Sequence, residues 1–298
     1  MSMSSIRASK SDELYRPTMI ITDDYNRQVF LPREWSPVEY HRLVALFVLL
    51  QLFQRSIIDA YLFIVSADAN LGKVDKSMLS PQTLMELLID GITTNKERIT
   101  QQKPDIEQWF GVIYNDYREI TTIQWRFKGL EGTIDLQWLP FTVISVSFQI
   151  NKLSGEIDLE HLPDGLVDLS TGNNALSGTL NLILLPAHLE ELLLHINKFE
   201  GSVCLTQLPA TLKMLNLSSN ALSGTLDVTS LPEGFKHLLV HKNAFEGETD
   251  FQSLPSTLES LYVANTRLSG EVWLKMGTDF YGDDSSVKVH WISDKIYQ

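Results

Sequence analysis

The stretch LKMLNLSSNALSGTL, residues 212–226, decides the fold of this chain, because variants of it recur at a fixed interval. Its glycine belongs to a set of seven that stand 23 residues apart: Gly132, Gly155, Gly178, Gly201, Gly224, Gly247 and Gly270. A strict period of this length is typical of a stacked array, in which each unit buries its apolar face against its neighbours. Inward and outward residues alternate in segments such as Glu191–His195, which predicts one half-buried strand per unit.

The rest of each unit carries further turn signals. After each glycine we expect a second short extended run, for example Thr133–Leu136 and Thr225–Val228. A Leu-Pro pair then closes most units, and proline has no backbone donor for a strand ladder. One asparagine per unit recurs at the same phase, at Asn151, Asn174, Asn197, Asn220 and Asn243. A buried amide at this phase is expected to bond the backbone of its own turn and of the adjacent turn.

The pattern L-x-x-L-x-L-x-x-N-x-L-S-G-x-[ILV] resembles the leucine-rich repeat, specifically its plant-type class. Trp109–Val112, followed by Ile120–Ile123, resembles the N-terminal cap of that class, but its flanking cysteines are missing and Tyr114 stands where one would be. The D-L-x-x-L-P corners are similar to leucine-rich-repeat proteins of protists, kinetoplastids among them. The resemblance implies an α/β solenoid, a leucine-rich-repeat horseshoe of seven 23-residue repeats, preceded by a small helical N-terminal module.

The parts outside the repeats do not share the period. We expect a disordered or extended N-terminus at 1–20, a helical module at 21–103, the solenoid with its N-terminal cap at 104–276 and a C-terminal capping segment at 277–298. In the helical module, Ser36–Val65 has the capping residues and apolar stripe of a buried helix. Ser80-Pro81 predicts the start of a second helix, and a third short helix is expected within Thr94–Gln102. Val287–Trp291 alternates like a strand.

Composition excludes several classes of function. The net charge of −13 argues against nucleic-acid binding and against docking on an anionic membrane, since both are driven by clustered Lys and Arg. No membrane span is expected, because the longest apolar run, Leu43–Leu50, is far shorter than the ~20 residues that a spanning helix needs. The single cysteine, Cys204, allows no internal disulfide and indicates a reducing compartment. We therefore expect a cytoplasmic protein, with a short mitochondrial presequence at the N-terminus as the alternative.

The candidate site is the concave face that the outward strand positions would form. Its residues are Leu193, His195, Ile196, Met214, Asn216, His237, Leu239, His241 and Tyr262. Concave faces of solenoids are the usual binding surfaces, and exposed apolar residues grouped in one patch indicate a protein contact. The interpretation competes with simple scatter of apolar residues over the surface. We expect an intracellular protein–protein interaction module that binds a protein partner of unknown identity on this face.

Other chemistry is not expected. The three histidines do not converge on one point, as zinc ligands must. The column Asp135, Asp158, Asp227 and Asp250 is interpreted as turn caps rather than as a calcium site. No catalytic or cofactor fingerprint occurs, so we expect no cofactor and no enzyme activity. Two alternatives stay open: a structural subunit that docks in a larger assembly through the helix 36–65, and a ubiquitin-ligase-type effector, for which Cys204 lies unfavourably inside a repeat.

Overall fold

The computed structural model describes residues 20–22, 28–30 and 76–292. The chain divides into two compact units between Leu87 and Leu88. In the first unit, β1 (Ile20–Thr22) pairs antiparallel with β2 (Gln28–Phe30), and η1 (Lys76–Met78) is a short 3-10 helix. The predicted helix at Ser36–Val65 lies outside the described residues.

The helix α3 (Pro81–Leu88) begins where the Ser80-Pro81 pair predicts. Its start is stabilised by Ser80, whose Oγ accepts a hydrogen bond from the Thr83 backbone N at 3.1 Å. This satisfies one of the free N–H groups that open every helix. The apolar side chains of Leu84 and Leu88 are buried, as the periodicity predicts.

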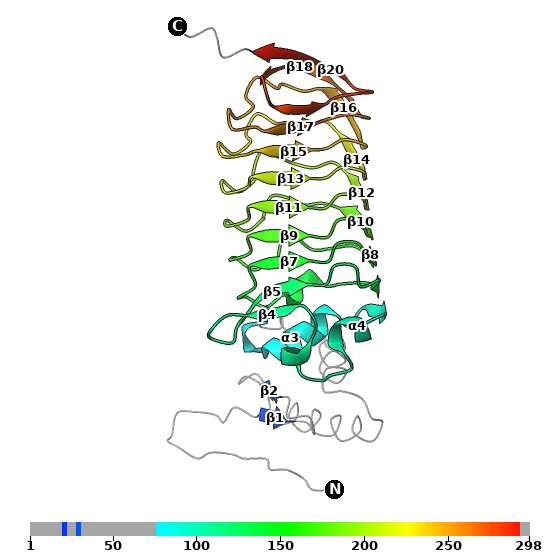
Figure 1. Cartoon of the computed structure of the whole chain (residues 1–298), viewed down its shortest axis with the longest axis vertical. Helices are drawn as coiled ribbons and strands as arrows, with labels where there is room; N and C mark the ends of the chain where they lie inside the picture. Colours follow the sequence, from blue (N-terminus) through cyan, green and yellow to red (C-terminus); the bar gives the residue numbers. More distant parts are fainter. Residues whose placement is uncertain (1–19, 23–27, 31–75, 293–298) are drawn as a thin grey trace, which may run out of the picture. The chain divides into compact units, whose positions relative to one another are not determined.

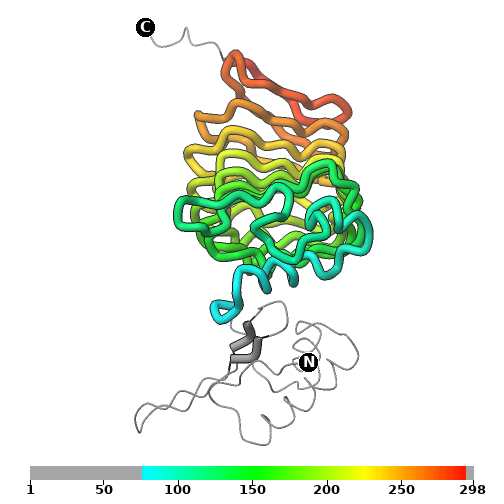
Figure 2. Tube along the Cα trace, turned by 60° about the horizontal axis from the view of Figure 1, so that its bottom comes forward, coloured from blue at the N-terminus to red at the C-terminus, as the bar shows by residue number. Residues whose placement is uncertain are grey.

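The second unit is a solenoid whose turns stack along one axis (Figures 1 and 2). Its described residues form two nine-stranded sheets that run along the stack. The first sheet contains β4 (Val112–Tyr114), β5 (Ile120–Gln124), β7 (Ser145–Ser147), β9 (Asp168–Ser170), β11 (Glu191–Leu193), β13 (Met214–Asn216), β15 (His237–Leu239), β17 (Ser260–Tyr262) and β19 (Asp279–Tyr281). The second contains β3 (Ile92–Thr94), β6 (Glu131–Gly132), β8 (Lys152–Gly155), β10 (Ala175–Thr179), β12 (Lys198–Gly201), β14 (Ala221–Gly224), β16 (Ala244–Glu248), β18 (Arg267–Lys275) and β20 (Ser286–Ile292).

The pairing confirms seven repeats and shows what closes each end of the described stack. In the first sheet Glu191 pairs with Met214, an offset of one full repeat, so residues of equal phase lie side by side. In the second sheet Gly178 pairs with Phe199, which staggers the ladder by two residues. Each sheet has one antiparallel strand at its N-terminal end, β4 or β3, and one additional parallel strand at its C-terminal end, β19 or β20.

The core lies between the two sheets and is built from the inward positions of every repeat. Leu192, Leu215, Leu238 and Leu261 are fully buried in consecutive strands of the first sheet. Full burial of one such side chain stabilises the fold by about 1.5–3 kcal/mol. At the N-terminal end Trp125 stacks on Phe148 with ring centroids 5.3 Å apart, which fills the first turns with aromatic rings.

The repeated glycines end the strands of the second sheet. Gly155, Gly201 and Gly224 have φ between 80° and 84°, a region that side chains with a Cβ rarely adopt. In most units the strand of the second sheet precedes the glycine and stops at or just beyond it, so the expected extended run after the glycine is not part of the ladder. In the last unit β18 continues past Gly270, since β20 supplies a partner for seven of its residues.

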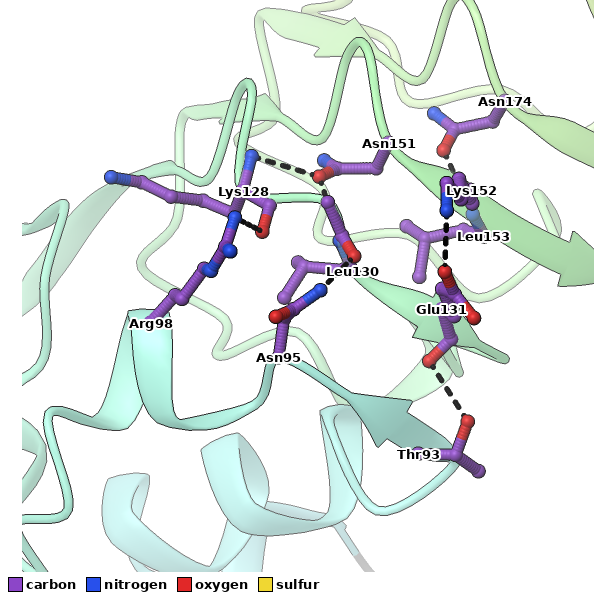
Figure 3. A network of polar contacts seen from close by, with 11 residues as sticks. Thr93, Asn95, Arg98, Lys128, Leu130, Glu131, Asn151, Lys152, Leu153 and Asn174 are labelled. Atoms are coloured by element: carbon purple, nitrogen blue, oxygen red, sulfur yellow. Dashed lines mark hydrogen bonds and ion pairs between the residues drawn. The ribbon is translucent and has the colours of Figure 1, made fainter.

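The asparagine ladder is confirmed, and it shares its acceptors between neighbouring turns. Asn174 donates from Nδ2 to the carbonyls of Phe148 at 3.0 Å and Thr171 at 2.9 Å. Its Oδ1 accepts from the Leu153 backbone N at 3.0 Å (Figure 3). The Phe148 carbonyl also accepts from Asn151, and the Thr171 carbonyl also accepts from Asn197. Each of these two carbonyls is thus held by two successive ladder residues.

The N-terminal end of the solenoid is closed by residues that we expected in the helical module. Ile92–Thr94 form β3, and their β-branched side chains favour a strand. Asn95 donates to the Gly129 carbonyl at 2.6 Å, and Arg98, in α4 (Glu97–Thr100), donates to the Lys128 carbonyl at 3.2 Å (Figure 3). The helix α4 lies within the predicted third helical segment, and two 3-10 turns, η2 (Ile106–Gln108) and η3 (Leu136–Trp138), follow.

Candidate functional site

The outward residues of the first sheet lie in straight rows, because its strands pair at an offset of one repeat. The middle row reads Gln124, Ser147, Ser170, Leu193, Asn216, Leu239, Tyr262 and Tyr281. The row beside it reads Thr122, Ser145, Asp168, Glu191, Met214, His237, Ser260 and Asp279. Neighbouring members of a row are about 4.8 Å apart. We call the surface formed by these two rows, together with the residues just after each strand, the first-sheet face.

The first-sheet face differs in chemistry between its two ends. The middle row is polar through Ser170, and from Leu193 onward it is apolar or aromatic except at Asn216. Every predicted site residue is partly exposed: Leu193, His195, Met214, Asn216, His237, Leu239, His241 and Tyr262 are half-buried, and Ile196 is 47% exposed. Their register places Leu193, Asn216, Leu239 and Tyr262 side by side. Whether these residues bind a partner stays a prediction.

Ile196 occupies a distinct position at the end of its strand. Its φ of 53° lies in the left-handed region, and the equivalent residues of the other repeats, from Phe127 to Asn265, also have φ between 53° and 58°. This conformation is uncommon for a β-branched side chain. It turns the chain out of the first sheet and leaves the Ile196 side chain at the rim of the first-sheet face.

His195 and His241 each follow a middle-row residue, Leu193 or Leu239, by two positions, and both rings are half-buried. His195 lies over Gly172, where an added Cβ would come within 2.4 Å of the imidazole Cε1. Burial lowers the pKa of His195, and burial together with the charges of Lys242 and His195 lowers the pKa of His241. The Nδ1 atoms of both histidines are buried without a hydrogen-bond partner in the described structure. Both rings are therefore expected to be neutral at pH 7.

An aromatic cluster closes the C-terminal end of the face and includes a residue that sequence reasoning missed. His241, Tyr262 and Tyr281 contact one another edge to face, with ring centroids 5.7 to 5.9 Å apart. We name these three rings the ring cluster. Tyr281 was missed because it follows Tyr262 by 19 residues and falls outside the 23-residue period. The only signal was the alternation in Asp279-Phe280-Tyr281, which repeats that of Ser260–Tyr262.

The carboxylates of the aspartate column cap turns, as the sequence predicts. Asp158 Oδ1 accepts from the Glu160 backbone N at 2.7 Å, and Asp227 Oδ1 accepts from the Thr229 backbone N at 3.0 Å. Asp135 and Asp250 make the equivalent bond two residues ahead. Across residues 76–292 no three potential metal-ligating side chains converge on one site.

Cys204 is half-buried inside a repeat. Its Sγ lies 3.2 Å from the Thr206 hydroxyl, and this hydrogen bond lowers the pKa of the thiol.

None of the described helices has the length and apolar character needed to cross a bilayer.

Seven 23-residue units, an asparagine ladder and two sheets that run along the stack define a leucine-rich-repeat solenoid. No protein-family model and no curated protein sequence matches the chain.

Several solved structures are similar to this chain. Pollen Receptor Kinase 3 is 22% identical, with a TM-score of 0.49, over 73% of this chain and 99% of that one. The ectodomain of the receptor kinase GASSHO1/SCHENGEN3 from Arabidopsis thaliana, solved with CASPARIAN STRIP INTEGRITY FACTOR 2, is 20% identical, with a TM-score of 0.48, over 64% of this chain. The chain spans 27% of that ectodomain. The PEPR1–AtPEP1 complex is 19% identical, with a TM-score of 0.48, over 65% of this chain and 34% of that one.

Proposed function

We propose that this chain is an intracellular interaction module that binds a protein partner on the C-terminal half of the first-sheet face. One observation carries the proposal: from Leu193 to Tyr281 the middle row presents half-exposed apolar and aromatic side chains in direct register, interrupted only by Asn216. Scattered apolar residues need no explanation, but a contiguous strip of them is typical of a protein contact. Aromatic residues are also enriched where binding energy concentrates.

The framework beneath the strip supports this role. Each outward side chain from Leu193 to Tyr262 stands on a strand paired on both sides within the stack, and the asparagine ladder fixes the turn that follows the strand in most repeats. Little conformational entropy is then lost when a partner binds, which favours affinity for a given contact area. The proposed mechanism is recognition, with no chemical step and no cofactor.

An intracellular location is part of the proposal and follows from cysteine usage. Cys204 is the single cysteine of the chain, so neither end of the solenoid is closed by an internal disulfide. In the described structure hydrogen bonds from Asn95 and Arg98 hold the N-terminal end instead. Such an arrangement suits a reducing compartment, in which disulfides do not persist. Fractionation of the native source, with antibodies against the chain, would test the location.

The face is tested by charge substitution with a matched control. We expect Leu193→Asp together with Leu239→Asp to abolish partner capture from the native source, because each buries a carboxylate at the contact. The control is Leu184→Asp, since Leu184 is 59% exposed and lies outside the first-sheet face. It should leave capture unchanged, and circular dichroism should show that all variants fold.

Two other outcomes separate the alternatives. Capture that survives both face substitutions would refute the face hypothesis and point to assembly through residues 36–65. Capture or activity lost on Cys204→Ser would instead support thiol chemistry of the ligase type.

A further inference from the structure

The ring cluster is partly exposed, and its rings lie at steep angles to one another, so it is more than a packing contact. Its three rings contact one another at interplanar angles of 62° to 80°, so their faces point in different directions. His241 and Tyr262 are half-buried, and Tyr281 is 36% exposed on the terminal strand β19. Among the described residues no further strand follows β19 in this sheet. The ring cluster therefore lies at the open end of the described sheet, and each of its rings is partly exposed.

Negative charge is fixed beside these rings. The Tyr262 hydroxyl donates a hydrogen bond to Asp279 Oδ2, which holds that carboxylate against the cluster. Asp283 lies two residues beyond Tyr281 and is exposed, as is Asp284. A carboxylate that accepts one hydroxyl keeps other lone pairs free for a second donor.

The positive charges nearby do not cancel this arrangement. Burial, and after it the charge of Lys242, lowers the pKa of His241, so its ring is neutral at pH 7 and adds no cation. His237 lies 3.7 Å from Glu259 and faces an acid of its own. Lys242 follows His241 directly in the chain and is exposed. Against it stand the Asp279 carboxylate at the cluster and a chain of net charge −13.

We propose that the ring cluster, with Asp279 as counter-ion, binds a cationic side chain, preferentially arginine, from an extended segment of the protein partner. The proposal rests on the proposed function, and it names the chemistry of the partner. A cation within about 6 Å of an aromatic centroid is attracted by the negative ring face, and guanidinium also stacks and bonds carboxylates through two donors. The acidic chain would speed the approach of a basic partner.

The test uses the full chain and a defined probe. The probe is a blocked pentapeptide with one central arginine flanked by serine and glycine, and its control carries citrulline, which has the same shape but no charge. Binding is followed by NMR of labelled tyrosine and histidine rings, with Tyr262→Phe and Tyr281→Phe used to assign the signals. We expect the arginine peptide, titrated to about 10 mM, to shift the Tyr281 and His241 signals in a saturable way and the citrulline peptide not to do so.

Substitutions locate the site. Asp279→Asn keeps an acceptor for the Tyr262 hydroxyl but removes the charge, so it should weaken binding of the arginine peptide about tenfold or more. Tyr281→Ala should weaken it similarly. The control is Glu248→Gln, which removes an exposed carboxylate from β16 in the other sheet and should leave the affinity within about twofold.

The results distinguish this proposal from the face hypothesis. Equal shifts with both peptides, or an affinity insensitive to Asp279→Asn and Tyr281→Ala, would overturn the cationic site. If partner capture is still lost in the Leu193→Asp, Leu239→Asp variant, the face hypothesis stands without it. Equal losses in Glu248→Gln and Asp279→Asn would show general attraction to an acidic protein and would also overturn the site.

Discussion

The asparagine ladder offers the sharpest test of how the solenoid is held together, through the adjacent residues Asn173 and Asn174. Asn174→Ala removes the hydrogen bonds donated to the Phe148 and Thr171 carbonyls, a longer one to the Gly172 carbonyl at 3.5 Å, and the bond accepted from the Leu153 backbone N. The Phe148 and Thr171 carbonyls each keep a second donor from the ladder, so the loss of each of these two hydrogen bonds costs about 1 kcal/mol. The Leu153 N–H loses its side-chain acceptor, which costs a further 1–3 kcal/mol or so.

The expected sum is a loss of roughly 3–5 kcal/mol in the free energy of unfolding. The control is Asn173→Gly: Asn173 is exposed and has φ of 57°, a conformation that glycine adopts readily, so about 1 kcal/mol or less should be lost.

The assay is urea unfolding followed by circular dichroism, combined with hydrogen exchange at the Leu153 amide. Because a solenoid can open in parts, the exchange rate at Leu153 reports the local loss even where global unfolding is not two-state. In Asn174→Ala this amide should exchange much faster than in wild type, and in Asn173→Gly it should not. If the two variants lose equal stability, or if Leu153 stays protected in Asn174→Ala, the ladder does not hold the turns in the way described.

Two further predictions concern the backbone and pH. Gly201→Ala should lower the free energy of unfolding in urea by about 1–2 kcal/mol, because φ of 80° penalises a Cβ, which would also lie 3.1 Å from Thr179 Cγ2. The control Gly234→Ala, with open space around the added Cβ, should lose far less stability, and equal losses would contradict the strand-ending role of Gly201. Because the folded-state pKa values of His195 and His241 are lowered, the unfolded chain binds more protons below about pH 6.5, and stability falls as pH drops through that window. Replacing both histidines with glutamine should reduce the loss in melting temperature between pH 7.5 and 5.5, and an unchanged loss would assign it to other groups.

The repeats were predictable because their signals are periodic, and the exceptions occur where the period stops. The glycine spacing and the alternation in Glu191–His195 are enough to set the number of repeats and the row of outward residues. Tyr281 was not predicted because the last turn is four residues shorter than the others. The 23-residue spacing therefore could not place Tyr281 beside Tyr262. Ile92–Thr94 escaped for a different reason, since their pairing with β6 is non-local and antiparallel.

The second strand of each unit was not predicted from the sequence, which indicated only an extended run after the glycine. Thr225–Val228 alternates as a strand does, but ladder pairing is decided by where the chain turns. The positive φ of Gly224 turns it one residue earlier, and Ala221–Gly224 make the pairs instead. The candidate site was predictable as a set of outward residues, whereas the ring cluster depends on contacts between strands that no single repeat contains.

The position of β19 at the end of its sheet couples the ring cluster to local opening of the last turn. Terminal units of a repeat array open more readily than internal ones, because they are held by one neighbour in place of two. Tyr262 and Tyr281 stand on adjacent strands, and only the second stands on the terminal strand of the described sheet. Fraying of the last turn would dismantle the ring cluster while the repeats up to β17 stayed folded. A ligand bound to the ring cluster would in turn slow amide exchange in β19. The exchange rate in β19 would therefore measure how far the ring cluster is occupied.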